Sequence, residues 1–549
     1  MNLKLTLLSL FVAFSQFAQE KNPLPKYEMR GVWVATVDNI DWPSQKGTTI
    51  KNQKNEYVEL LDSLEKLNMN TVLFQVRPQG DAFYKSSFEP WSEYLMGKQG
   101  QAPASKMESY DPLQFIIEQT HRRGMEFHAW LNPYRISIYP EIEEKLDTNH
   151  IYFKHPEWFV KYGERYYFNP GVEESKEFVL KVVKEIVSDY DIDALHFDDY
   201  FYPYEIKDTP FPDSMQYANY VAQYDSITNI KTDTLRLDRD TINYKLVETK
   251  REFYTVEDWR RGNVNTMVEA VYNIIQETKP WVKFGISPFG VWRNKSVDDR
   301  GSDTRAGQTN YDNLYADVLY WLDNGWVDYL TPQIYWRIDE KAPAPFDVVA
   351  NWWSNINTDV KIFVGQGVYR LDKNSKYKFW QTTDGFSKQI EIIRAYDNLE
   401  GSMHFSAKHF KKNPLNINQQ LSNNEYSKPA IAPSYPDAKI NTHQVKDVLV
   451  SGSRKKGVKF QWSDITDGNI RYYLVYRFEG EEIRDMTVAN NLVAKVSGYA
   501  VKQQFEDTTV KKWKKYTYSI TSVDRFNVES ISSKPVTIKV KCNRIKKYK

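Results

Sequence analysis

The chain has 549 residues and a formal net charge of +1, and it is long enough for one large domain and a smaller one. A net charge so close to zero gives no electrostatic basis for binding nucleic acid, and we expect no nucleic-acid partner. The 16 Trp, 38 Tyr and 28 Phe residues either fill a large core or provide faces that stack on sugar rings.

The N-terminus is typical of a secretory signal peptide. An apolar run from Leu5 to Phe14 follows Lys4 and ends in small and polar residues, and it is too short to span a bilayer. We therefore predict a signal peptide over residues 1–18 and no integral membrane segment. The only cysteine is Cys542, and export without disulfides favours a bacterial periplasm or cell surface.

Eight apolar, strand-like runs alternate with amphipathic helical stretches over residues 27–410. The runs begin at Met29, Thr71, Met125, Ile192, Lys283, Asp328, Ile362 and Gly401. This alternation predicts an α/β fold, a (β/α)8 TIM barrel. Asp111 followed by Pro112 marks the start of one of its helices. A polar stretch at 227–245, after the fourth run, is either a mobile flap over the active-site face or a decoration.

A different pattern follows the eighth run. Residues 411–440 are rich in Asn, Pro and Ser and are expected to form a linker. Residues 441–541 contain short alternating runs, and the stretch from Tyr516 to Ser530 resembles the late strands of a fibronectin type III domain. Trp462 is then the buried tryptophan of an early strand. We expect an all-β sandwich here and find no chemistry in its residues.

Alternate side chains of a barrel strand face inward, and this parity places polar residues inside the barrel near the strand ends. Leu195 and Phe197 are apolar and should face the helices, so His196 and Asp198 should face inward. The other residues placed inward are Gln75, Arg77, His128, Trp130, Asn132, Gln333, Tyr335, Gln366, His404 and Ser406. Any single one could satisfy a hydrogen bond in the core, but a set that converges on one rim indicates a ligand site.

A metal site is a competing interpretation of this rim. His196 and Asp198 face inward, with His128 and His404 as further candidate ligands, but the sequence contains no HxH or HExxH spacing. We therefore expect neither a metal nor another cofactor. The aromatic neighbours are better interpreted as a surface for sugar rings.

The stretch IDALHFDDYFYP, residues 192–203, ends the fourth run with two adjacent acids, Asp198 and Asp199. Glycoside hydrolysis usually needs two carboxyl groups across the scissile bond, yet no Glu ends another run, and nearby acids such as Asp81 and Glu89 lie in loops. Adjacent acids suffice if the acetamido oxygen of an N-acetyl sugar attacks its own anomeric carbon. One acid then orients the acetamido group and the other protonates the leaving oxygen; by chain position these are Asp198 and Asp199, respectively.

Several long motifs resemble the bacterial glycosyl-hydrolase-like 10 family: MRGVWVATVDNIDWP from Met29, TVLFQVRPQGDAFY from Thr71, HFDDYFYP from His196 and GISPFGVWRN from Gly285. The resemblance covers roughly residues 27–408. Members of this family are exported glycosidases, and one branch cleaves peptidoglycan glycan strands that have lost their stem peptides. The resemblance therefore implies a barrel and a glycan partner, with peptidoglycan as the first candidate.

The family motifs also imply which residues hold the substrate. Beside the two catalytic acids, the candidates are Arg77, Gln79, Asn132, Arg135, His196, Tyr202, Trp292, Gln333 and Tyr335. Tyr335 is the candidate for binding the acetamido group. Arg77 and Trp292 also have structural interpretations, the first as an ion-pair partner of Asp198 and the second as a core residue.

Two other classes of function remain open. One is a conventional retaining or inverting glycosidase on another polysaccharide, with a loop acid as the second carboxyl group. The other is a non-catalytic glycan-binding protein, which the lack of a second acid at a strand end would fit. Whichever of these functions applies, we expect the protein to be a monomer.

Overall fold

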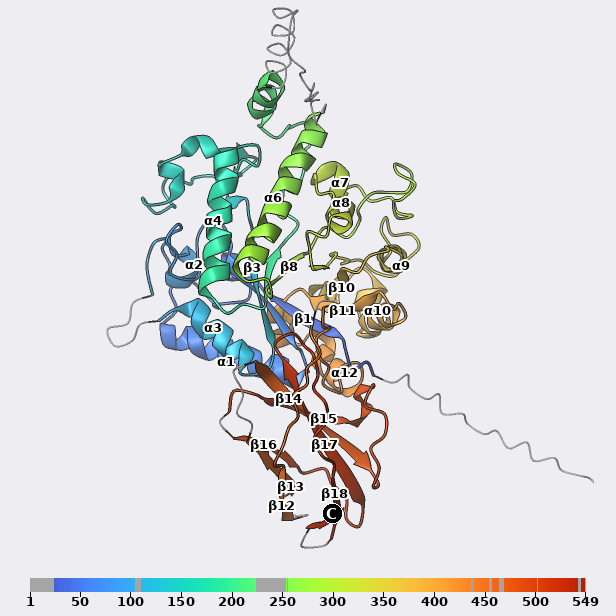
Figure 1. Cartoon of the computed structure of the whole chain (residues 1–549). Coiled ribbons are helices and arrows are strands. Elements are labelled where there is room, and N and C mark those ends of the chain that lie inside the picture. Colours follow the sequence, from blue (N-terminus) through green and yellow to red (C-terminus); the bar gives the residue numbers. More distant parts are fainter. Residues whose placement is uncertain are drawn as a thin grey trace, which may run out of the picture.

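The structure, a computed structural model (Figure 1), describes residues 24–103, 110–223, 253, 255–435, 438–453, 457–463, 469–500, 502–541 and 545–548. The expected signal peptide, the polar stretch at 227–245 and Cys542 lie outside the described residues. Within the described ranges, no helix combines the length and the apolar character needed to cross a membrane.

Eight parallel strands close into a barrel, which confirms the predicted fold class. Their order around the barrel is β1, β11, β10, β9, β8, β7, β3 and β2, and β1 pairs with both β11 and β2. The strands are β1 (Met29–Val34), β2 (Thr71–Arg77), β3 (Glu126–Leu131), β7 (Ala194–Phe197), β8 (Lys283–Ile286), β9 (Tyr329–Leu330), β10 (Lys361–Gln366) and β11 (Leu399–His404). Each predicted run overlaps one of them.

Helices surround the barrel (Figure 1), and their apolar faces pack on the outer sides of the strands to form the main core. The helix α3 begins as predicted, because Asp111 accepts the backbone N–H of Gln114 and Pro112 occupies the first turn. The helices are α1 (Ile50–Lys66), α2 (Glu93–Met96), α3 (Pro112–His121), α4 (Glu173–Asp189), α6 (Val256–Thr278), α7 (Asn310–Asn313), α8 (Val318–Asp323), α9 (Phe346–Ser354), α10 (Asp384–Arg394), α11 (Ala407–Lys412) and α12 (Ile417–Asn423).

Shorter elements build the loops around the barrel. A small antiparallel sheet follows β3 and consists of β4 (Arg135–Ser137), β6 (Arg165–Phe168) and β5 (Phe159–Tyr162). Single turns of 3₁₀ helix occur at η1 (Val37–Asn39), η2 (Ile151–Phe153), η3 (Pro156–Trp158), η4 (Val368–Arg370), η5 (Lys378–Trp380) and η6 (Pro414–Asn416).

The predicted inward and outward faces hold for most strands and fail at the end of β2 and in the last two strands. Trp130 lies in the inner core and Leu195 in the outer one, as expected. In β11, however, Met403 faces inward, whereas His404 packs against Phe386 and Phe410. Gln366 on β10 likewise bonds a residue of α10, with 3.2 Å between the two side-chain amides.

A register shift explains the error for His404, whereas β10 alternates regularly and Gln366 simply shares the outer face of Ile362 and Val364. The pairing of β10 with β11 shifts between Ile362 and Val364, and Gly401 in β11 has a φ of +130°. This conformation favours glycine and produces a bulge. Because side chains alternate along a strand, one extra residue reverses every later assignment. The hydroxyl of Ser406, just past β11, donates to Asp41 at 2.9 Å.

The C-terminal residues form an all-β sandwich, as predicted. One sheet contains β12 (Leu449–Ser453), β13 (Gly457–Trp462) and β16 (Gln503–Asp507). The other contains β15 (Leu492–Ser497), β14 (Ile470–Glu479), β17 (Lys515–Asp524), β18 (Val536–Val540) and β19 (Ile545–Tyr548), with the short turn η7 (Ala489–Asn491) before β15. Trp462 is buried between them, and its ring packs on that of Tyr473 with 5.4 Å between centroids.

The segment at 411–440 is bonded to both domains. Ile417 and Leu421 of α12 are buried in the outer core of the barrel. Further along, the carbonyl of Ile431 accepts the backbone N–H of Glu28 at 2.9 Å, and the side chain of Ile431 packs in a cluster with Leu474 of the sandwich. The segment is therefore packed along the barrel and continues into the contact between the two domains.

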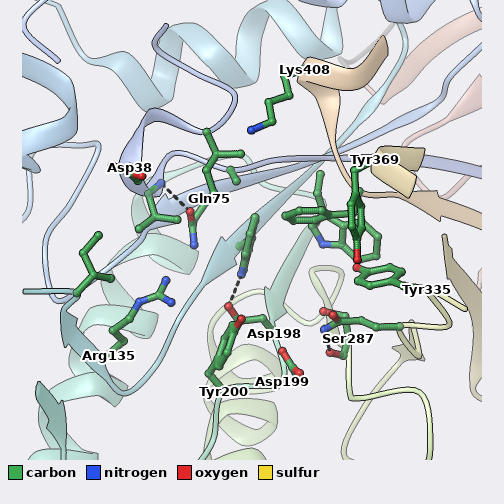
Figure 2. A pocket seen from close by; sticks show the side chains of 18 of the residues that line it. Asp38, Gln75, Arg135, Asp198, Asp199, Tyr200, Ser287, Tyr335, Tyr369 and Lys408 are labelled. Atoms are coloured by element: carbon green, nitrogen blue, oxygen red, sulfur yellow. Dashed lines mark hydrogen bonds between the residues drawn. The ribbon is translucent and has the colours of Figure 1, made fainter. Parts of the chain in front are cut away.

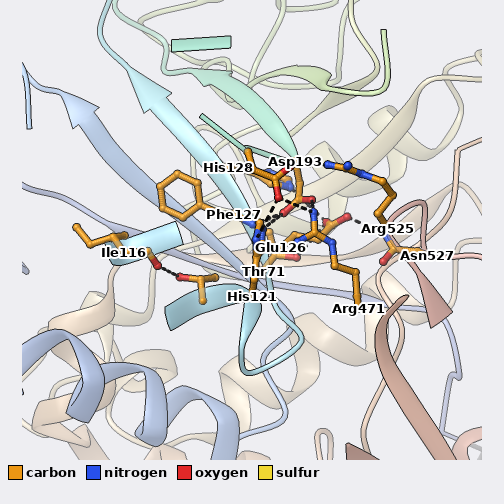
Figure 3. Close-up of polar contacts among 12 residues, drawn as sticks. Thr71, Ile116, His121, Glu126, Phe127, His128, Asp193, Arg471, Arg525 and Asn527 are labelled. Carbon is orange, nitrogen blue, oxygen red and sulfur yellow. Dashed lines mark hydrogen bonds and ion pairs between the residues drawn. The ribbon is translucent and has the colours of Figure 1, made fainter. Parts of the chain in front are cut away.

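The sandwich docks on the end of the barrel where the strands begin (Figures 1 and 3). Asp193, just before β7, is buried and accepts from Arg471 of β14 at 2.6 Å, while Nε2 of His121 lies 2.7 Å from its other oxygen. Arg525 pairs with the more exposed Asp191 at 2.7 Å. Burial alone would raise the pKa of Asp193, but Arg471 and then His121 hold it well below its usual range.

We predict that Arg471→Ala destabilises the protein by about 3 kcal/mol, because it leaves a buried carboxylate without its cation. Arg525→Ala is the matched control and should cost less than about 1 kcal/mol, since the Asp191 side chain is 56% exposed. Urea unfolding followed by tryptophan fluorescence measures both. Because the folded pKa of Asp193 is lowered, the contribution of the pair is complete above about pH 4 and is lost as the pH falls further. Equal losses for the two variants would contradict the assignment.

Candidate active site

A cavity of about 600 Å³ opens where the barrel strands end, on the opposite end from the sandwich (Figure 2). Its lining brings together residues from all eight strand–loop units of the barrel. They include Trp33, Asp38, Gln75, Trp130, Arg135, Arg165, Asp198, Asp199, Tyr200, Ser287, Gln333, Tyr335, Tyr369, Phe405, Lys408, His409 and Lys412. The wall is therefore both aromatic and charged.

Asp198 and Asp199 both line this cavity, although each is less than 5% exposed. Asp198 accepts from the indole nitrogen of Trp130 and from the amide of Asn132, each at 3.2 Å. Asp199 accepts from the hydroxyl of Tyr204 at 2.6 Å. The two carboxyl groups thus have separate donors, which fix them side by side at the end of β7.

Burial is the main reason that both acids resist ionisation. It raises the pKa of Asp198 to about 7, with Arg135 acting against this and Asp199 adding to it. Burial also raises the pKa of Asp199, and the donors on Tyr204 and Gln333 act against it. Near neutral pH the pair can therefore hold one proton between them, which is the state a general acid requires.

Three predicted substrate-binding residues line the same cavity. Gln333 donates to the carbonyl of Ser287 at 2.8 Å, which leaves its amide oxygen available. The ring of Tyr335 packs edge-on against Tyr369, with 5.9 Å between centroids. Arg135 lies over the ring of Tyr200, 5.4 Å from its centroid. Their arrangement offers flat faces and polar edges around the acid pair, as sugar rings require.

Two other predicted residues lie behind the wall and support it. Asn132 is fully buried and holds Asp198 as described above. His196 is also fully buried, with its two ring nitrogens 3.0 Å from the hydroxyls of Tyr329 and Ser287. Burial lowers the pKa of His196 well below its usual value, with His128 adding to the effect, so its ring is neutral. Both residues act on the cavity through the side chains in front of them.

The four remaining candidates lie away from the cavity. Arg77 pairs with Glu89 and not with Asp198, because the register of β2 shifts between Gln75 and Arg77 and turns its side chain toward the loop that follows. Gln79 accepts from the hydroxyl of Tyr94 at 3.2 Å. These residues brace the loop after β2.

Tyr202 and Trp292 are core residues of neighbouring loops. Tyr202 is 1% exposed, and Asn263 of α6 donates to its hydroxyl at 3.2 Å. Trp292 is fully buried and stacks on Trp352 with 6.1 Å between ring centroids. The structure therefore favours the core interpretation of Trp292 over a role in holding substrate.

Asp38 and Lys408 line the cavity and were missed from the sequence. Asp38 lies in η1 after β1 and has a φ of 51°, a left-handed conformation that Asp tolerates better than most residues. Gln75 holds this turn, since its amide oxygen accepts the backbone N–H groups of Thr36 and Val37 at 3.1 and 3.0 Å. The sequence feature that could have identified Asp38 is an acidic residue directly after the first predicted strand.

No group of three or more His, Cys, Asp or Glu side chains is arranged to hold a metal ion within the described ranges. The chemistry that the cavity can support with its own residues is proton transfer between a buried acid pair and a bound ligand.

The geometry defines the class of this protein. It is a barrel with two adjacent acids in a cavity at the ends of its strands. The model of the family described as Glycosyl hydrolase-like 10 matches residues 28–381. Glycosyl hydrolase YngK of Bacillus subtilis (strain 168) is 43% identical over 517 residues, 93% of this chain and 93% of that protein. Glycosyl hydrolase DigH of Escherichia coli (strain K12) is 35% identical over 405 residues, 70% of this chain and 84% of that protein. The chain belongs to the glycosyl hydrolase-like 10 family.

Solved structures show a more distant likeness. The glycoside hydrolase domain of PgaB (BpsB) from Bordetella bronchiseptica aligns with a TM-score of 0.44 and 12% sequence identity, over 72% of this chain and 98% of that one. An endo-beta-1,4-mannanase from Thermotoga petrophila aligns with a TM-score of 0.38 and 10% identity, over 95% of this chain and 98% of that one.

We predict that hydrolytic activity depends on the proton held by the acid pair. The kcat/KM should fall above about pH 7, the pKa of Asp198, because it reports the free enzyme. Arg135 lowers that pKa, so Arg135→Gln should move the alkaline limb upward by about one pH unit. Arg305→Gln, which changes an arginine outside the cavity wall, should leave the limb in place. A downward shift in Arg135→Gln would contradict this electrostatic assignment.

Proposed function

We propose that the protein is an exported glycoside hydrolase that cleaves N-acetylated glycan strands, with peptidoglycan strands as the first candidate. The observation that carries this proposal is the adjacent pair Asp198 and Asp199, buried together in an aromatic-walled cavity. Membership of the glycosyl hydrolase-like 10 family supports the reaction class. We further propose that it acts as a monomer in the periplasm or at the cell surface.

The proposed mechanism uses the substrate's acetamido group as the nucleophile. Asp198 accepts a hydrogen bond from the acetamido N–H, and the acetamido oxygen attacks the anomeric carbon to form a cyclic oxazoline. The bond from that carbon to the glycosidic oxygen breaks, and Asp199 gives its proton to the departing oxygen. Water then attacks the anomeric carbon and returns a proton to Asp199, and the ring opens to restore the acetamide.

The hydrogen bonds of the pair support this division of roles. Trp130 and Asn132 donate N–H groups to Asp198, and a third donor from the acetamido group would stabilise its ionised form further. Substrate binding would then leave the shared proton on Asp199, which has the hydroxyl of Tyr204 as its partner. We propose that Tyr335, which lines the same cavity, binds the acetamido group.

A conventional two-carboxylate mechanism is the second candidate, and Asp38 is the observation that favours it. Asp38 is exposed and lines the same cavity from the loop after β1. It is therefore a better partner acid than Asp81, which is fully buried, or Glu89, which is paired with Arg77. In that mechanism the second carboxyl group attacks the anomeric carbon or activates a water.

We predict that Asp199→Asn lowers the rate on natural glycan by about 10²–10⁴-fold, as expected for loss of a general acid. An aryl glycoside with a good leaving group should restore most of this activity, because its departure needs no proton. Asp198→Asn should stay slow on both substrates, since the nucleophile is no longer oriented. Steady-state hydrolysis of the two substrates measures this. Asp38→Asn should have little effect, and a loss as large as that of Asp198→Asn would favour the two-carboxylate mechanism.

We also predict that the N-acetyl group is required. Chemically de-N-acetylated strands should be cleaved at least about 100-fold more slowly than acetylated strands, because the nucleophile is missing. Product analysis by mass spectrometry on amidase-treated peptidoglycan strands and on their deacetylated form makes the comparison. Equal turnover would exclude the substrate-assisted mechanism, and binding without any turnover would make the protein a glycan-binding one.

A further inference from the structure

The last helix of the barrel carries two lysines into the cavity wall. Lys408 and Lys412 of α11 both line the cavity, as expected for residues one helical turn apart. In Figure 2, Lys408 and the acid pair lie on different sides of the cavity. Lys411, on the same helix, is exposed and does not line it. One face of α11 thus presents positive charge to whatever the cavity holds.

This helix is held in place by a partly buried acid. Asp41, in the loop after β1, accepts the backbone N–H of Lys408 at 2.7 Å and the hydroxyl of Ser406 at 2.9 Å. Its second oxygen accepts the backbone N–H of Ala35 at 2.7 Å. The backbone of α11 is therefore fixed relative to β1, and the position of the two lysines follows from it.

Neither lysine makes a close ion pair in the described part of the chain, although the charge of Lys408 acts on Asp41 at longer range. Among the residues that the structure describes, no ion pair joins Lys408 or Lys412 to an acid within 4.0 Å. His409 lies between them and is neutral, because burial lowers its pKa to about 4 and the two lysines add to the effect. Unpaired cations of fixed position in a binding cavity are suited to an anionic group on the ligand.

The net charge of the whole cavity wall also favours an anionic ligand. Its wall holds four permanent cations, Arg135, Arg165, Lys408 and Lys412. The acids of the wall are Asp38 and the catalytic pair, and they carry only two negative charges when the pair holds its proton. The working form of the cavity is therefore positive, which disfavours a cationic glycan and favours an anionic one.

We propose that Lys408 and Lys412 form a subsite for a carboxylate carried by a sugar of the substrate, so that the cavity selects acidic N-acetylated glycans over neutral ones. This inference rests on the proposed function, because it places the glycan in the same cavity. It adds a specificity determinant on α11, on a different side of the cavity from the reacting bond.

The test compares two forms of one glycan. Peptidoglycan strands freed of stem peptides by an amidase carry a carboxylate on alternate sugars, and conversion of these groups to methylamides removes the charge while keeping the N-acetyl groups. The wild-type enzyme should have a kcat/KM about tenfold higher for the carboxylate form. The double variant Lys408→Gln/Lys412→Gln should lose this preference, mainly through KM. The control Lys411→Gln should keep it. Raising the salt concentration should reduce the preference of the wild type.

The outcomes separate this inference from the proposed function. A double variant that keeps the wild-type preference would overturn the subsite, even if both glycans are cleaved. If the wild type cleaves neither glycan, the proposed function fails, and calorimetric binding of the two glycans then decides the subsite. Tighter binding of the carboxylate form that disappears in the double variant would support the subsite, and equal binding would overturn it.

Discussion

The burial of two adjacent carboxyl groups at the end of β7 is the constraint on which the rest of the site depends. An ionised carboxylate without partners is strongly destabilising inside a protein, and two side by side also repel each other. Trp130 and Asn132 from β3 and its loop, and Tyr204 from the loop after β7, supply the donors that make the pair tolerable. β3 and β7 are paired neighbours in the barrel, so the donors that follow β3 lie close to the acids that follow β7.

The two ends of β7 show how partners decide the state of a buried acid. Asp193 precedes the strand and Asp198 follows it, and both are buried. Arg471 gives Asp193 a direct cation, so its pKa is lowered and it serves as a permanent anion that docks the sandwich. Asp198 receives neutral N–H donors and a cation that forms no direct pair with it, so its pKa is raised to about 7. The same strand thus supplies a structural acid at one end and a titratable one at the other.

The sequence predicted those parts of the fold and site that depend on regular alternation. The eight runs, the helices between them and the inward faces of β3 and β7 follow from the patterns of apolar residues, and so does the placing of Asp198 beside Trp130. The errors for Arg77 and His404 share one cause, since a bulge adds a residue and reverses the faces beyond it. Gln366 lies on the outer face for a different reason, because β10 alternates regularly and Gln366 shares the side of Ile362 and Val364.

Loop residues were the other source of error, because parity does not apply to them. Tyr202 and Trp292 follow strands closely in sequence, yet they fold back into the core. Asp38 and Lys408 look like ordinary surface residues in the sequence, and their place in the cavity depends on contacts between distant segments. A family motif identifies residues that matter but does not separate those that touch a ligand from those that support the loop.

The contact between the first and last strand–loop units explains why these distant residues meet. β1 and β11 are neighbours only because the barrel closes, and Asp41 then joins the loop after β1 to the start of α11. Asp38 lies in that loop and Lys408 in that helix, so both reach the cavity wall through this one connection. Closure of the barrel and completion of the charged wall are therefore the same structural event. A barrel that failed to pair β1 with β11 would keep the acid pair on β7 but lose the part of the wall that faces it from α11.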